Sequence, residues 1–233
     1  MRGKLLRVFP LAVVLMCLAS TFLMVGCGSS GARFRYVQAS TGAPANVDLE
    51  VDGKSVLTDI AYGLPGSYQK VSSGSRKIDI FQTGSTANPY FSGTASLVSG
   101  DTTLISENAF STIALTSYKD DNTAPASGNV RLRFIHAGPS AGMTVDVYVV
   151  TQGNGISGLS PQISGLAYQA ASSYLSFSAG NYEVVVTQPG TQNPISGLDV
   201  NYTFTAGQVR TIVILDSPQG GAPYNQLVLD DLN

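Results

Sequence analysis

The sequence predicts an all-β protein with two tandem, immunoglobulin-like antiparallel β-sandwich domains behind an N-terminal lipoprotein signal peptide. The first observation is a repeat, because Arg33–Ala39 (RFRYVQA) returns as Arg131–Ala137 (RLRFIHA) and Val47-Asp48 returns as Val145-Asp146, both 98 residues later. A period of this length fits a duplicated small domain and is too long for a solenoid. The second observation is that no segment of either copy shows ten residues of helical periodicity, whereas many short segments alternate apolar and polar residues.

The first 26 residues read as an export signal. Three basic residues precede an apolar run over 8–25, and this run ends in Leu23-Met24-Val25-Gly26-Cys27. That ending resembles the lipobox of bacterial lipoproteins, in which the cysteine is lipidated and becomes the mature N-terminus. Cys17 would be removed with the signal, so Cys27 would be the one remaining cysteine. We therefore expect lipidation at Cys27, with an uncleaved membrane anchor or ordinary secretion as the alternatives.

A lipid anchor makes the membrane the first expected partner and places the chain in the cell envelope. Gly28 and Ser29 follow the cysteine and no Asp stands there, which by resemblance to enterobacterial sorting rules favours the outer membrane. Three of the 13 Lys and Arg residues lie in the signal, so ten remain against 15 Asp and Glu, giving a mature side-chain charge near −5. No basic stripe exists to neutralise phosphates, so nucleic acid is not an expected partner.

Each copy reads as a series of strands. In the segment 33–37, Phe34 and Tyr36 alternate with arginines, and apolar residues at 47, 49 and 51 alternate with acidic ones. Asp52-Gly53 then predicts a two-residue hairpin turn, whereas copy two has a longer loop from Gln152 to Pro161 that contains Asn154. The later strands are expected at 90–98, 102–106 and 112–118 in copy one, and at 200–204, 209–215 and 226–232 in copy two.

The boundaries follow from this organisation. Residues 1–26 are the signal peptide, 27–32 the lipidated cysteine and tether, 33–119 the first domain, 120–128 a polar linker, and 129–233 the second domain. The acidic pairs at 120–121 and 230–231 lack the alternating spacing of a calcium loop, so we expect a solvated linker and a solvated terminus, and no metal site.

The residues also resemble a known family, the tandem domain of unknown function 4397 (DUF4397) of bacterial lipoproteins and secreted proteins. Copy two carries the resemblance through Phe134-Ile135-His136-Ala137-Gly138-Pro139, Val145-Asp146-Val147-Tyr148, Ala167-Tyr168 and the segment 174–180. Copy one departs from the motif at Gln38, Thr41 and Glu50. The resemblance implies a β-sandwich of unknown biochemical role.

The candidate chemistry is sparse. His136 is the only histidine, and no nucleophile elbow or second base accompanies it; its counterpart is Gln38, which cannot act as a base near neutral pH. A loop-organising role therefore fits both copies better than catalysis, and we expect no catalytic residue and no cofactor. The four tyrosines that recur between the copies are expected in core or corner packing; they are Tyr62, Tyr68, Tyr168 and Tyr174.

The repeated charges predict a structural pair in each copy. By strand parity, Arg35 with Asp48 and Arg133 with Asp146 lie off the core face, where each pair would form a cross-strand ion pair; a carboxylate or sugar clamp is the functional alternative. Residues that differ between the copies are the better candidates for binding. They are His136, Tyr148, Asn154 and Tyr224.

Together these features predict a lipid-anchored envelope module without catalytic activity, which contacts a protein or glycan through loops at the ends of the sandwiches. A small-ligand carrier or an envelope hydrolase is one alternative. A passive spacer that holds something away from the membrane is the other, and rigid packing between the domains would favour it.

Overall fold

The computed structural model describes residues 31–43 and 45–232. The signal peptide and Cys27 lie outside these residues. No helix in the described ranges has the length and apolar character needed to cross a membrane. The chain is almost entirely β-structure, as the sequence predicts, with two short 3₁₀ helices at Phe110–Thr112 and Pro139–Ala141.

The sixteen strands of the described residues divide into two sets of eight, and no sheet among them contains strands from both sets. The strands of the first set are β1 (Ala32–Gln38), β2 (Val47–Val51), β3 (Lys54–Ile60), β4 (Gln69–Val71), β5 (Gly74–Gln82), β6 (Phe91–Leu97), β7 (Gly100–Glu107) and β8 (Ala114–Lys119). Those of the second set are β9 (Asn129–His136), β10 (Thr144–Thr151), β11 (Ile163–Ala167), β12 (Leu175–Ser178), β13 (Gly180–Thr187), β14 (Pro194–Phe204), β15 (Val209–Leu215) and β16 (Asn225–Asp230).

Each set forms a sandwich of two four-stranded sheets, and the two sandwiches have matching topology. The sheets of domain 1 have the orders β4-β1-β7-β8 and β3-β2-β5-β6, and those of domain 2 have the orders β12-β9-β15-β16 and β11-β10-β13-β14. Among the strands named above, all pairings are antiparallel except two, since β1 pairs with β7 and β9 pairs with β15 in parallel. The predicted tandem β-sandwich is confirmed. The parallel strand pair occurs at equivalent positions in the two domains, so both copies have the same strand register there.

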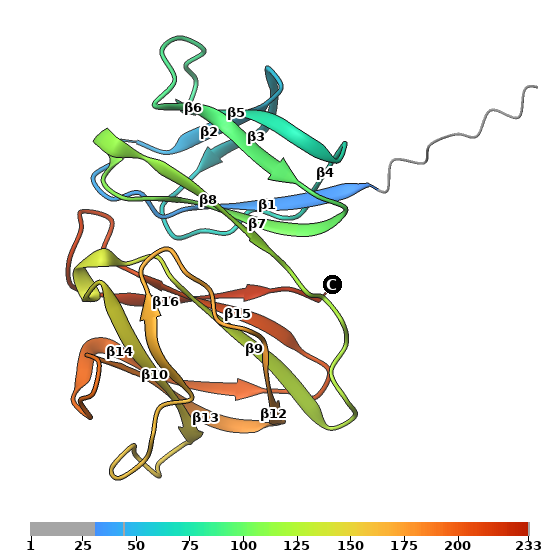
Figure 1. Cartoon of the computed structure of the whole chain (residues 1–233). Coiled ribbons are helices and arrows are strands. Elements are labelled where there is room, and N and C mark those ends of the chain that lie inside the picture. Colours follow the sequence, from blue (N-terminus) through green and yellow to red (C-terminus); the bar gives the residue numbers. More distant parts are fainter. Residues whose placement is uncertain (1–30, 44, 233) are drawn as a thin grey trace, which may run out of the picture.

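The hairpin turn of copy one forms where it was predicted. Asp52 and Gly53 join β2 to β3 with φ angles of 52° and 73°, the left-handed values that a tight two-residue turn requires. Copy two replaces the turn with the segment 152–161, which appears at the bottom of Figure 1, at the end of domain 2 farthest from domain 1. The loop folds back on its sheet, where Ile156 packs with Tyr148 and Val185.

The three largest hydrophobic clusters form three layers, one inside each sandwich and one between the domains. One cluster fills each sandwich, built in domain 1 around Phe34 and Tyr36 and in domain 2 around Leu132 and Phe134. A further cluster lies between the domains and is made of buried residues from six strands of both sandwiches. Its members are Val37, Ala39, Ile105, Tyr118, Ile135, Ala137, Val213, Leu215 and Leu229.

The four sheets are therefore stacked, as Figure 1 shows, with the sheet of β1, β7 and β8 lying on the sheet of β9, β15 and β16. Strand alternation explains how one sheet serves two cores. Leu104 on β7 points into domain 1 and its neighbour Ile105 points to the domain junction. Both faces of these central sheets are buried, so the junction is an integral part of the fold.

Candidate functional site at the domain junction

Two arginines lie at the junction because their neighbours on the strand fill a sandwich core. Phe34 and Tyr36 point into domain 1, so Arg35 between them must point to the opposite face of β1. The same alternation places Arg133 on the junction face of β9. Each arginine is only 2% exposed. A buried guanidinium must be paired and hydrogen-bonded, so its partners decide what the site does.

The partner of Arg35 comes from the other domain. Its Nη2 forms an ion pair with the carboxylate of Asp231, which follows β16 at the end of domain 2. Its Nη1 donates to the backbone oxygen of Asp230 at 2.7 Å, and its Nε donates to Oγ1 of Thr103 on β7 at 2.9 Å. Arg35 thereby joins its own sheet to the last strand of the second sandwich.

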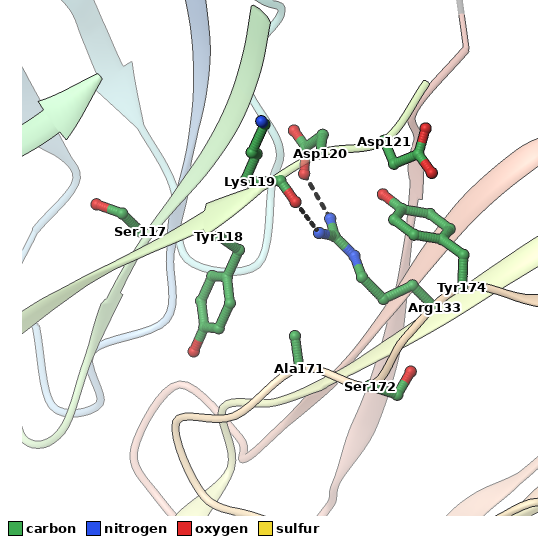
Figure 2. Close-up of a pocket in the computed structure, with 9 residues that line it drawn as sticks. All are labelled: Ser117, Tyr118, Lys119, Asp120, Asp121, Arg133, Ala171, Ser172 and Tyr174. Atoms are coloured by element: carbon green, nitrogen blue, oxygen red, sulfur yellow. Dashed lines mark hydrogen bonds and ion pairs between the residues drawn. The ribbon is translucent and has the colours of Figure 1, made fainter. Parts of the chain in front are cut away.

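Arg133 makes the same set of contacts in the opposite direction (Figure 2). Its Nη2 lies 2.5 Å from Oδ1 of Asp120, its Nη1 donates to the backbone oxygen of Lys119 at 2.8 Å, and its Nε donates to Oγ1 of Thr211 at 2.9 Å. Asp120 and Lys119 belong to the end of domain 1. The arginine of each domain therefore holds the terminal aspartate of the other, and we call these two exchanged pairs the junction clamp.

Tyr68 and Tyr174 complete the junction clamp. Each hydroxyl donates to the aspartate of its own domain, at 2.6 Å to Asp120 and at 2.8 Å to Asp231. Each ring also lies against the guanidinium of its own domain, with the arginine carbon 4.9 Å and 4.7 Å from the ring centroids. Burial raises the pKa of both hydroxyls, so they remain protonated donors.

A cleft of about 490 Å³ opens beside Arg133, with lining residues from both domains (Figure 2). Its buried charges, Arg133 and Asp120, are already paired with each other and hold the two domains together. In residues 31–43 and 45–232, no cluster of three His, Cys, Asp or Glu residues is arranged to hold a metal ion. The lining residues are Ser117, Tyr118, Lys119, Asp120, Asp121, Arg133, Ala171, Ser172 and Tyr174.

The pairing of Arg35 with Asp48, and of Arg133 with Asp146, is not formed. Asp48 instead accepts backbone N–H groups from Asp59 at 2.8 Å and Gly84 at 2.9 Å. Asp146 accepts them from Gly165 at 2.7 Å and Gly190 at 2.8 Å. These aspartates lie on the outer sheets and tie neighbouring loops to β2 and β10, whereas the arginines lie on the inner sheets. The prediction that these arginines and aspartates lie off the core faces is correct, but the two members of each pair lie on different sheets of the sandwich.

In each acidic pair one aspartate is buried and the other is exposed. The expectation of a solvated linker and a solvated terminus is therefore wrong for one residue of each pair. Asp120 is 6% exposed and Asp231 is 0% exposed, since both enter the junction clamp. Asp121 and Asp230 are exposed and form surface ion pairs with Arg131 and Arg210. In each copy one carboxylate turns inward and the next turns outward, as alternation along an extended chain requires.

His136 lies in the interior, where its Nε2 is 2.7 Å from the backbone oxygen of Gly142. Burial lowers the pKa of the imidazole, so it is neutral at pH 7. Its counterpart Gln38 likewise holds a loop, accepting the N–H of Ser40 at 2.5 Å and donating to the oxygen of the same residue at 3.2 Å. Both contacts match a loop-organising role.

The other three candidate binding residues differ in their exposure to solvent. The sequence comparison makes Tyr148 and Tyr224 the candidates for an exposed aromatic contact, because neither is matched in the other copy. Tyr148 is only 2% exposed and packs with Ile156 of the long loop, so this expectation is wrong for Tyr148. Asn154 is exposed at the tip of that loop. Tyr224 is half-buried, and its hydroxyl donates to the backbone oxygen of Ser140 at 2.8 Å.

Two tyrosines also form hydrogen bonds across the junction, and the sequence indicates that they matter without indicating where they lie. The hydroxyl of Tyr62 donates across the junction to the backbone oxygen of Asp216 at 2.9 Å, and that of Tyr168 donates across it to Oδ1 of Asn108 at 2.8 Å. Their recurrence in both copies was a visible signal, but it does not distinguish packing inside one domain from packing between two. Glu107, which is fully buried beside the junction, has no counterpart in copy two that would mark it.

The duplicated topology and the shared motifs agree with a match between the chain and one family. The pattern described as "Domain of unknown function (DUF4397)" matches residues 32–148 and 140–233. The chain belongs to this family. The two matches together span both sandwiches, so DUF4397 here describes the duplicated fold and carries no assigned activity. No curated protein matches the chain.

Solved structures give only remote likenesses. The TIE protein of Bacillus anthracis is 10% identical with a TM-score of 0.26, and 79% of this chain covers 34% of that one. A leucine-rich repeat protein from Bacteroides thetaiotaomicron is 16% identical with a TM-score of 0.22, and 83% of this chain covers 27% of it. The DUF4397 chain thus spans about a third or less of each of these two solved chains.

Removing one member of the junction clamp should destabilise the protein strongly, because the other charge stays buried. We expect Arg35→Ala to lower the free energy of unfolding by about 3–5 kcal/mol, and Asp231→Ala to have a similar effect. The double variant should cost clearly less than the sum of the two. Chemical denaturation of the four proteins measures this coupling.

The matched control is Arg76→Ala, which removes a half-buried arginine whose side chain is 26% exposed and whose Nη1 lies 3.2 Å from the exposed Asp52 on domain 1. It should leave the unfolding midpoint almost unchanged. Additive effects of Arg35→Ala and Asp231→Ala, or effects no larger than that of the control, would show that the clamp does not stabilise the fold.

Glu107 should make stability depend on pH. Burial raises the pKa of its carboxyl to about 7, against hydrogen bonds from the hydroxyls of Thr116 and Tyr118 that lower it. The folded state therefore binds this proton more tightly than the unfolded state, whose pKa is near 4.5. Stability should fall as pH rises from about 4.5 through about 7, by about 3 kcal/mol in total.

Glu107→Gln removes the titrating group and keeps the shape of the side chain. The variant should be more stable than the native protein at pH 8 and show little advantage at pH 5, as measured by urea unfolding at both pH values. An equal difference at the two pH values would mean that the Glu107 carboxyl does not titrate with a raised pKa.

Proposed function

We propose that this protein is a lipid-anchored, non-catalytic module of the cell envelope whose two sandwiches act as one rigid body. In this role it holds a contact surface, formed by loops at the far end of domain 2, away from the membrane. The junction clamp is the single observation that carries the proposal, because exchanged buried ion pairs and a shared apolar layer oppose independent motion of the domains.

The link between the domains supports the same role. Arg131 Nη1 donates to the backbone oxygen of Thr123 at 2.8 Å, and its Nη2 pairs with Asp121, so the segment between β8 and β9 is tied down. Free domain motion would require these contacts to break. Two independently moving modules are therefore the less favoured arrangement.

The packing also favours a structural role over a carrier or a hydrolase. Both sandwich interiors are filled by large buried side chains, and the cleft beside Arg133 lies at the junction. The charges in that cleft are bound to each other, and His136 is buried and engaged in its own loop. We infer that contact with a protein or glycan occurs on the surface, where the long loop exposes Asn154 and Leu159.

The rigid-body part of the proposal can be tested by measuring one distance across the molecule. Val98 in domain 1 and Leu159 in domain 2 are both exposed, by 43% and 46%. Spin labels at Val98→Cys and Leu159→Cys should give one narrow distance distribution by pulsed electron paramagnetic resonance on the anchored protein. A broad or multiple distribution would contradict a rigid body.

The contact part can be tested with the same two positions. A photo-crosslinking residue at 159 should capture a discrete envelope component in living cells, whereas the same residue at 98 should not. Equal capture at both sites, or none at 159, would remove the far-end loop as the contact surface. Recovery of both labelled proteins with the membrane fraction, and loss of that association in Cys27→Ser, tests the anchor.

A further inference from the structure

Two equivalent turns at the domain junction share a backbone conformation but differ in side chains. Domain 2 presents Tyr168-Gln169 in one turn, and domain 1 presents Tyr62-Gly63 at the matching position of the other. Gln169 and Gly63 share an unusual left-handed backbone, with φ angles of 61° and 67°. The turn thus carries a long amide side chain in domain 2 and no side chain in domain 1.

Around the Gln169 turn, the polar groups satisfy one another. Asn108, which follows β7, accepts a hydrogen bond from the Tyr168 hydroxyl at 2.8 Å, and the Gln169 Nε2 lies 3.4 Å from the same Oδ1. The backbone N–H of Asn108 donates to the Tyr168 hydroxyl at 2.9 Å. The partners that Tyr168 and Gln169 bond on the other domain are thus the neutral amide and backbone groups of Asn108.

Beside the Gly63 turn, an acidic residue takes the place of Asn108. Asp216, which follows β15, is only 2% exposed, and the Tyr62 hydroxyl bonds to its backbone oxygen instead of its carboxylate. One carboxylate oxygen accepts the N–H of Ser140 at 3.3 Å, and the other has no hydrogen-bond partner among the described residues. No ion pair involves Asp216 in the part of the chain that the structure describes.

Asp216 lines a cleft of about 420 Å³ between the domains. Aromatic, aliphatic and proline side chains form most of its wall, including Leu64, which is 60% exposed. The volume falls within the range of small-molecule sites. The lining residues are Tyr62, Gly63, Leu64, Asp216, Ser217, Pro218, Pro223, Tyr224 and Asn225.

We propose that this cleft binds an organic cation, an ammonium or guanidinium group carried on an apolar stem. A buried carboxylate without a cation is costly, and a cationic ligand would remove that cost. The rings of Tyr62 and Tyr224 suit both the stem and the charge. The neighbouring His136 forms no ion pair with Asp216; burial lowers the pKa of its imidazole, against Asp216, which raises it. The proposal rests on the rigid junction, since both domains line the cleft.

The test is isothermal titration calorimetry of the full chain in detergent micelles with cadaverine and agmatine, which carry an ammonium and a guanidinium on short alkyl stems. Both should bind saturably, and 1-pentanol, which has a similar stem without a charge, should not. A blocked lysine tripeptide distinguishes the source. Tighter binding of the tripeptide than of cadaverine assigns the site to a partner protein's side chain, and weaker binding assigns it to a free amine.

Two variants remove the site by different means. Asp216→Asn deletes the charge, and Gly63→Gln introduces the side chain that its counterpart carries at the same φ; each should weaken amine binding at least tenfold. Asp199→Asn, which neutralises an exposed carboxylate on β14 outside the cleft, should leave it unchanged. Undiminished binding in both cleft variants, no binding of either amine to the native protein, or equal binding of 1-pentanol would overturn the proposal.

This outcome is separable from that of the proposed function. The spin-label distance reports on the rigid junction without any ligand, whereas amine binding reports on the cleft. A narrow distance distribution with no amine binding would reject the cleft alone. A broad distribution would reject the rigid body first.

Discussion

Four buried charges at the domain junction constrain the rest of this structure. Arg35, Arg133, Asp120 and Asp231 lie where water is excluded, and each can remain ionised there only if an opposite charge and hydrogen-bond partners are in place. The fold supplies those partners by exchange, since the arginine of each sandwich meets the aspartate of the other. Separating the domains would therefore leave all four charges without their partners across the junction.

The surrounding architecture is consistent with this constraint. The inner sheets have one face in a sandwich and one face at the junction, and the apolar cluster between them is continuous with the clamp. A duplicated chain can meet itself through equivalent surfaces, in the manner of a twofold dimer whose halves are covalently joined. The agreement between the contacts of Arg35 and Arg133, down to the threonine and the backbone oxygen that each bonds, shows this pseudo-symmetry.

The sequence predicts the fold more completely than the site, for a physical reason. Alternation, turn residues and the repeat report on local geometry, and they gave two sandwiches, the Asp52-Gly53 hairpin and the correct face for Arg35. They do not report what lies opposite that face. The face of β1 that carries Arg33, Arg35 and Val37 reads as solvated, which points to Asp48 as the partner of Arg35. The true partner, Asp231, can be found only when the stacking of the two sandwiches is known. The sequence pattern also does not predict that β1 pairs with β7 in parallel, because this pairing depends on tertiary packing.

The central claim is that the exchanged pairs make two domains into one cooperative unit, and differential scanning calorimetry of the full chain tests it most directly. The account predicts one unfolding transition whose calorimetric enthalpy equals its van't Hoff enthalpy. It also predicts that Arg35→Ala with Arg133→Ala divides this transition into two. Two separate transitions in the native protein, or a calorimetric enthalpy about twice the van't Hoff value, would contradict it.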